Sequence, residues 1–178
     1  MGRVELHADR LMGREVAVKR MRVELASSSD ARHRFVREAR LQGQLEHPAV
    51  VPVHDLGTGA DGGVYFTMKP IRGVALDDIL ARLATDSHAP ERHSLRRLLS
   101  AFGQVCLAID FAHERGVVHR DLKPANVMLG DFGEVYVLDW GVAKAGAVHA
   151  DQGPIALHDL PTFDEVAKTA AGAVVGTP

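Results

Sequence analysis

The octapeptide HRDLKPAN, residues 119–126, is the most informative stretch of the 178-residue chain. It places Asp121, Lys123 and Asn126 between the short apolar runs VV and VML. A carboxylate can accept a proton from a hydroxyl group, an ammonium group can meet an anion, and an amide oxygen can bind a hard cation. Polar side chains in this order indicate a site with chemistry rather than a segment of the core.

This octapeptide matches the His-Arg-Asp-x-x-x-x-Asn pattern of protein kinases. The chain resembles a serine/threonine protein kinase of the eukaryotic-like type that is found in bacteria. The resemblance implies that Asp121 takes the proton of the substrate hydroxyl, that Lys123 neutralises the transferring phosphoryl group, and that Asn126 binds magnesium. A lysine two residues after the aspartate favours the Ser/Thr branch over the Tyr branch.

Further stretches resemble the same family at compatible spacings: VAVK (residues 16–19), the helical run FVREARLQGQLEHPAVV and the hinge-like YFTMKPIRG. The resemblance implies that Lys19 contacts the ATP phosphates and that Glu38 pairs with Lys19. MGRV resembles only the tail of the glycine-rich loop. The resemblance also implies nucleotide contacts for Gly2, Val4, Ala17, Met68, Lys69, Ile71 and Met128.

Two aspartates compete for the metal-binding position that follows the catalytic motif in this family. Asp131 belongs to the visible Asp-Phe-Gly, but it lies only five residues after Asn126 and between two glycines, where turn chemistry explains it. Asp139, in Asp-Trp-Gly, follows the apolar run EVYVL and lies eighteen residues after Asp121. We therefore expect Asp139 to be the magnesium ligand and Asp131 to lie in a hairpin turn.

Two residues depart from the family pattern. Trp140 replaces the usual phenylalanine, and an indole N–H needs a hydrogen-bond partner when it is buried. Such a ring is expected to bias the switch between active and inactive arrangements without loss of metal binding. Gln42 lies one turn after Glu38, where the family usually has an apolar residue.

The periodicity of the chain predicts strands at EVAVKRM, AVVPVHDLG and VYFTMK, a helix of about four turns between them, and two later helices. The second of these, from Leu95 to Ala112, is the longest periodic segment, and we expect Cys106 to be buried in it. The predicted fold class is α+β: a two-lobed kinase-like fold with a small antiparallel first lobe and an incomplete, mainly helical second lobe. The predicted boundaries are residues 1–72, including the hinge, and 73–178.

Composition limits the class of protein. The chain is 46% hydrophobic and 25% charged, with a formal charge of -2, which is ordinary for a globular protein and gives no nucleic-acid footprint. It has one cysteine, no zinc-ligand motif and no apolar run long enough to span a membrane. A cytoplasmic location is the default expectation, and the oligomeric state is left open.

Both ends appear cut relative to the family, since the first glycines and the helices after the activation segment are missing from the sequence. We therefore expect weak or no kinase activity from this chain by itself, and apolar surface where further helices would pack. The implied ligands are ATP, Mg²⁺ and a protein with Ser/Thr hydroxyls. The alternative is a non-catalytic, kinase-like binding or regulatory module. Arg120 suggests control by phosphorylation, with Thr169 the leading site ahead of Thr162 and Thr177.

Overall fold

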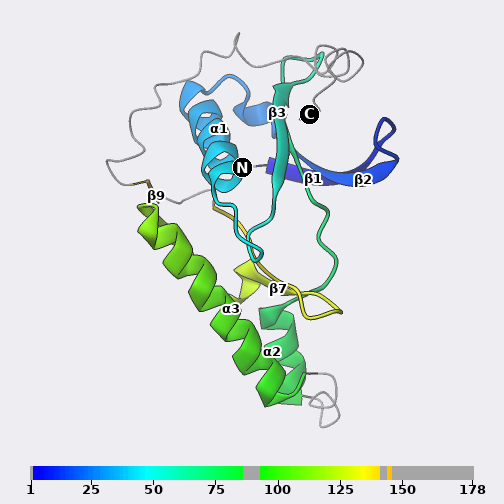
Figure 1. Ribbon diagram of the computed structural model, residues 1–178. Helices are drawn as coiled ribbons and strands as arrows, with labels where there is room; N and C mark the ends of the chain where they lie inside the picture. The colour runs from blue at the N-terminus through cyan, green and yellow to red at the C-terminus, as the bar shows by residue number, and fades with distance from the viewer. Residues whose placement is uncertain (1, 86–92, 141–143, 146–178) are drawn as a thin grey trace, which may run out of the picture.

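The computed structural model of the protein describes residues 2–85, 93–140 and 144–145. Two parts follow each other along the chain: an antiparallel sheet with one helix, and then two helices with two small sheets. In Figure 1 the helices α2 (Leu76–Thr85) and α3 (Leu95–Glu114) lie at the opposite end of the molecule from the four-stranded sheet. This arrangement confirms the predicted α+β class.

The first sheet has the strand order β1, β2, β4, β3, and every strand is antiparallel to its neighbours. Its strands are β1 Gly2–Asp9, β2 Arg14–Met21, β3 Val53–Thr58 and β4 Val64–Met68. In the register, Val4 pairs with Lys19 and Ala17 pairs with Met68. Cross-strand partners share a face, as do residues two apart on one strand, so these four side chains lie on the same face of the sheet.

Helix α1 (Ser29–Gln44) follows β2 and contacts β3 and β4. Ser28 caps its first turn, because the Ser28 Oγ accepts a hydrogen bond from the backbone N–H of Ala31 at 3.3 Å. The buried side chains of the helix are those of Ala31, Phe35, Val36, Glu38, Ala39, Leu41 and Gln42. Two of them, Glu38 and Gln42, are polar, and a buried polar group requires a partner.

The chain then crosses to the second part through residues 69–73, the short strand β5 (Val74–Ala75) and α2. Gly73 is required at this crossing, because a Cβ atom there would lie 2.4 Å from the carbonyl oxygen of Leu129. A substitution at Gly73 would push β5 away from the strand with which it pairs.

Helix α3 confirms the predicted long helix but corrects the predicted burial of Cys106. Its buried residues are Ala101, Val105, Ala108 and Ala112. Cys106, which we expected to be buried, is exposed, and so are the large apolar side chains of Leu95, Leu99, Phe102 and Leu107. The apolar residues of α3 extend around more of the helix than the neighbouring elements bury. Periodicity alone does not predict which of these apolar residues the neighbouring elements contact.

Two small sheets complete the described part. Their strands are β6 Val117–Val118 with β9 Lys144–Ala145, and β7 Val127–Leu129 between β5 and β8 Val135–Val137. The turn between β7 and β8 is closed by a 2.8 Å hydrogen bond from Gly130 N to Glu134 O. Asp131 is exposed in this turn and Phe132 is 94% exposed, which confirms the predicted hairpin.

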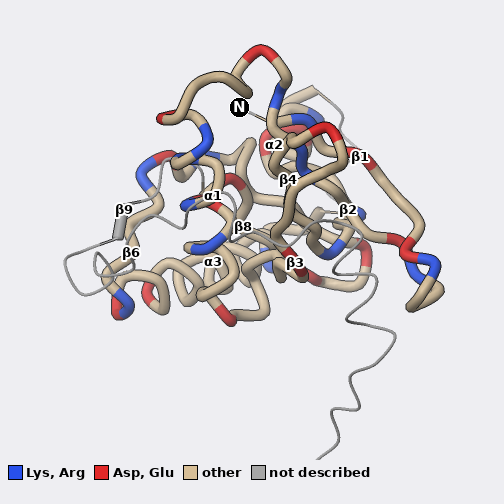
Figure 2. Tube along the Cα trace, turned by 90° about the horizontal axis from the view of Figure 1, so that it is seen from above, with Lys and Arg blue, Asp and Glu red and all other residues tan. Residues whose placement is uncertain are grey.

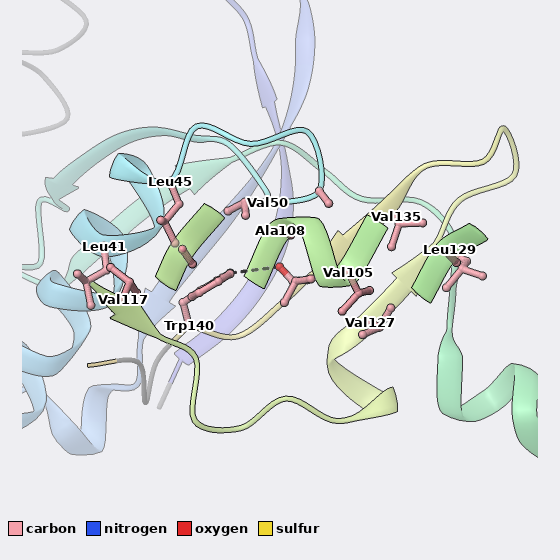
Figure 3. Packing of buried hydrophobic residues seen from close by; sticks show 14 of the residues in the cluster. Leu41, Leu45, Val50, Val105, Ala108, Val117, Val127, Leu129, Val135 and Trp140 are labelled. Carbon is pink, nitrogen blue, oxygen red and sulfur yellow. Dashed lines mark hydrogen bonds between the residues drawn. The ribbon is translucent and has the colours of Figure 1, made fainter. Parts of the chain in front are cut away.

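The two parts share a core in which residues of α1, α3, β7 and β8 meet (Figure 3). The segment from Ala49 to Pro52 joins them through the backbone. Val137 N donates to Ala49 O at 2.8 Å, and Val50 forms a parallel bridge with Val137. Lys69 adds a side-chain link, because its Nζ donates to the Tyr136 hydroxyl at 2.6 Å.

Trp140 is 1% exposed and lies in this shared core beside Leu41 and Leu45 (Figure 3). Its Nε1–H donates to Val137 O at 3.3 Å, which confirms that the buried indole has a partner. Its ring also meets the His119 ring edge-on, with the centroids 4.6 Å apart. Trp140 therefore lies between His119 and the last turn of α1, which contains Leu41.

Along the described part of the chain, Lys and Arg residues are interspersed with Asp and Glu residues, as Figure 2 shows. Within the described residues no helix combines the length and the apolar character that crossing a membrane requires.

Candidate active site

A cavity of about 510 Å³ lies between the first sheet, α1, the crossing segment and the residues that follow β8. Eight of the site residues predicted from the sequence line it: Val4, Ala17, Lys19, Glu38, Met68, Lys69, Ile71 and Asp139. Residues far apart in the sequence therefore line one cavity, whose volume is in the range usual for small-molecule binding sites. The cavity is also lined by Phe66, Gln42, Val51 and Leu138, for which no sequence pattern predicted a role in a cavity.

Lys19 and Glu38 form an ion pair in the wall of this cavity. Their side chains are 15% and 1% exposed, so each charge depends on the other in a dry environment. The Lys19 Nζ also lies 5.7 Å from the centre of the Phe66 ring. Within the described residues Glu38 Oε2 has no hydrogen-bond partner, which leaves a buried polar atom at the cavity.

Gly2 does not line the cavity itself but lies against the Lys19 side chain. A Cβ atom at Gly2 would be 3.0 Å from both Cγ and Cε of Lys19. The absence of a side chain therefore lets the start of β1 approach the lysine closely. Met128 is half-buried on β7 and is not part of the cavity wall, so its predicted contact with nucleotide stays a prediction.

The catalytic-motif residues form a hydrogen-bonded cluster around the Asp121 carboxylate. The Lys123 Nζ donates to Asp121 Oδ2 at 2.7 Å. The Asn126 Nδ2 donates to the backbone oxygen of Asp121 at 2.8 Å and to Oδ2 at 3.2 Å. Since both bonds use the amide nitrogen, Asn126 can still offer its Oδ1 to a metal ion.

Local structure holds this cluster in place. Asn126 ends a short 3-10 turn, η3 (Pro124–Asn126), and its carbonyl oxygen accepts from Leu138 N at 2.8 Å. His119 is buried, and its Nδ1 accepts from Asp121 N at 3.3 Å while its Nε2 lies 2.9 Å from Leu138 O. His119 therefore connects the backbone of Asp121 to the residue before Asp139.

The electrostatics of the cluster favour an ionised aspartate. The hydrogen bond from Lys123 is the main cause that holds the pKa of Asp121 below its usual 3.8. The same hydrogen bond raises the pKa of Lys123 above 10.5, and the charge of Asp139 contributes to that rise. The negative charge of Asp139 is thus close enough to act on Lys123.

Backbone geometry separates the two competing aspartates. Asp139 lines the cavity and has a φ of 59°, whereas Asp131 is exposed at the hairpin. Among the described residues other than glycine, Arg120 is the only other one with a positive φ, at 69°. Such strained conformations cluster at functional sites because the surrounding structure must hold them.

Magnesium binding and phosphorylation are two further features that the sequence predicts. The described residues contain no cluster of three or more His, Cys, Asp or Glu that could hold a metal by itself. Mg²⁺ is usually bound through one or two carboxylates together with substrate phosphates, so Asn126 and Asp139 suit it. The predicted phosphorylation positions Thr162, Thr169 and Thr177 lie outside the described residues.

Comparison with known proteins agrees with the motifs. The protein kinase domain family matches residues 1–156. The serine/threonine-protein kinase PknD of Chlamydia trachomatis serovar D is 36% identical over 189 residues, which cover 100% of this chain and 20% of that protein. The proteins named PknD in Chlamydia pneumoniae and Chlamydia abortus are 38% identical over 186 and 185 residues, in each case 100% of this chain and 19% of theirs.

The chain thus spans about a fifth of the length of the curated relatives it matches. The family match nevertheless covers most of the chain, from the start of the sheet to beyond Asp139. The chain belongs to the protein kinase family.

Proposed function

We propose that the protein transfers the γ-phosphoryl group of ATP to a Ser or Thr hydroxyl of a protein substrate. The observation that carries this proposal is the placement of Lys19, Glu38 and Asp139 around one cavity, together with the ion pair of Asp121 and Lys123. Little covalent chemistry is asked of a kinase beyond positioning and charge stabilisation, and this arrangement supplies both. The names of the relatives support the Ser/Thr class.

In this proposal the cavity holds the nucleotide. Lys19, kept in place by Glu38, binds phosphate oxygens, and the apolar side chains of Val4, Ala17 and Met68 enclose the base. The crossing segment from Lys69 to Ile71 borders the base from the side. We assign residues 1–72 to the first lobe with the hinge and residues 73–178 to part of the second lobe.

Asp121 acts as the proton acceptor. The carboxylate, whose pKa lies below its usual range, is ionised at neutral pH and can therefore take the proton from the substrate hydroxyl. The hydroxyl oxygen then forms a bond to the γ-phosphorus, the bond from that phosphorus to the β–γ bridging oxygen breaks, and ADP leaves. The positive charge of Lys123 offsets the charge of the moving phosphoryl group.

Asn126 and Asp139 are the residues that would hold Mg²⁺. Their donor atoms are an amide oxygen and a carboxylate, which are ligands that a hard cation prefers. When bound, the ion neutralises charge on the phosphates. The chain itself contributes the positions of both side chains through the bond from Leu138 N to Asn126 O.

Phosphoryl transfer from labelled ATP to Ser/Thr-containing proteins tests the proposal. In a protein that carries the complete kinase domain, Asp121→Asn should lower the rate by about 10²- to 10⁴-fold, the usual worth of a positioned base. Asp131→Asn is the matched control, because Asp131 is exposed at the hairpin, and it should leave the rate unchanged. An unchanged rate in Asp121→Asn would remove Asp121 from the mechanism. Binding of Mg·ATP without any transfer by a complete domain would favour a non-catalytic kinase-like module.

A further inference from the structure

Gln42 is a buried polar residue on the face of α1 that also carries Glu38. Residues four apart on a helix lie on the same side, so the two side chains are neighbours along the cavity-facing stripe. Gln42 is 6% exposed and lines the cavity. A buried amide is costly unless it is hydrogen-bonded, so its presence on this stripe requires a partner.

The partner is a backbone carbonyl outside the helix. The Gln42 Nε2 donates to Val51 O at 2.9 Å, and this hydrogen bond is buried. A buried bond of this kind is directional, so it fixes the rotation of α1 about its own axis in a way that apolar packing does not.

The Val51 segment is itself anchored to both parts of the molecule. Ala49 O accepts from Val137 N at 2.8 Å on one side of Val51. Pro52 O accepts from Lys69 N at 3.0 Å on the other side. Val51 therefore stands between β8, which leads to Asp139, and the crossing segment that borders the cavity.

From these contacts we propose that Gln42 is a positioning residue whose amide bond to Val51 holds Glu38 toward Lys19. It acts through Glu38 and is not itself a catalytic residue. The consequence for nucleotide binding rests on the function proposed above, whereas the effect on the Lys19–Glu38 pair does not. The bond connects the orientation of α1 to the strand that leads to Asp139.

The closing experiment measures the Lys19–Glu38 pair without any nucleotide. The rate at which the Lys19 amine is acetylated is followed by peptide mass spectrometry, because an ammonium group held by a carboxylate reacts more slowly. Gln42→Met keeps the side-chain length but removes the donor, and it should raise the rate about threefold to tenfold. Gln42→Leu is a second variant without the donor, and both are checked for folding by circular dichroism.

A double-mutant cycle distinguishes positioning from general loosening. In the Glu38→Gln background, Gln42→Met should change the Lys19 rate by less than about twofold, since residues that act through one another are not additive. Gln44→Met is the matched control: the same residue type at an exposed position of the same helix, and its rate should equal that of the parent. Equal effects of Gln42→Met in both backgrounds would overturn the proposal, and so would no effect in either.

Mg·ATP affinity of the same variants separates this inference from the proposed function. A loss of about tenfold in Gln42→Met, absent in the Glu38→Gln background, is expected from one lost buried hydrogen bond. If the parent protein bound no nucleotide, the proposed function would fail while the acetylation cycle still decided the role of Gln42.

Discussion

The Nζ atom of Lys123 lies 2.7 Å from Oδ2 of Asp121, so the two residues form an ion pair within the segment HRDLKPAN. Both side chains are partly exposed, and the pair therefore matters more for protonation than for stability. Its direct effect is to keep the pKa of the Asp121 carboxyl below 3.8.

Removal of the lysine should reverse that shift. In Lys123→Met the pKa of Asp121 should rise toward its ordinary value, because the largest cause of its depression is lost. The carboxyl carbon resonance of Asp121, followed by NMR against pH, measures the change. Arg96→Met removes the same charge from an exposed position on α3 and should leave the titration as it is.

The same pair sets a direction for stability against pH. The depressed pKa of Asp121 contributes stability above pH 3.8, and that contribution is lost as pH falls through the folded value. The raised pKa of Lys123 contributes stability below 10.5 that is lost as pH rises through its folded value. Lys123→Met should weaken both dependences in urea unfolding at the two extremes, and an unchanged pH profile would contradict the assignment.

The two aspartates near the end of the described chain should differ in their effect on metal binding. Asp139→Ala should abolish the rise in melting temperature that Mg²⁺ with ATP produces, because a ligand that binds only the folded form raises stability. Asp131→Ala should retain that rise, since Asp131 is exposed in the hairpin turn. The opposite pattern would reassign the metal to Asp131.

Trp140→Phe should destabilise the protein by about 1–3 kcal/mol. The smaller ring would leave space beside Leu41 and Leu45 and would remove the hydrogen bond from Nε1 to Val137 O. Urea unfolding measures the loss. Phe132→Ala is the control, since Phe132 is 94% exposed and its removal should change stability by less than about 0.5 kcal/mol.

Two glycine substitutions should act in opposite directions. Gly73→Ala should destabilise the chain, because its Cβ would lie 2.4 Å from Leu129 O, which is backbone and does not move aside easily. Gly103→Ala should stabilise α3 by about 0.5–1 kcal/mol, because a Cβ there meets nothing within 4 Å and alanine favours the helix. Thermal unfolding of both variants measures the difference in sign.

Sequence patterns predicted the helices and strands of this protein better than they predicted which residues of those helices and strands are buried. The helix that contains Cys106 was predicted and is present, but Cys106 was predicted to be buried and is exposed. The reason is that the apolar residues of α3 extend around more of the helix than the neighbouring elements bury. The hairpin position of Asp131 was predicted correctly for the opposite reason. Local strand and turn chemistry is enough to say which aspartate follows a strand and which one lies in a hairpin.

The candidate site divides in the same way. The segments HRDLKPAN and VAVK predict Asp121, Asn126 and Lys19 as site residues, because the pattern that indicates them spans only a few consecutive residues. The bond from Gln42 to Val51 and the bond from Lys69 to Tyr136 join residues whose proximity depends on how α1, the crossing segment and β8 pack. The sequence alone thus determines which residue types the site contains. Their positions relative to one another are decided by tertiary packing, because the contacts that fix those positions join residues far apart in the sequence.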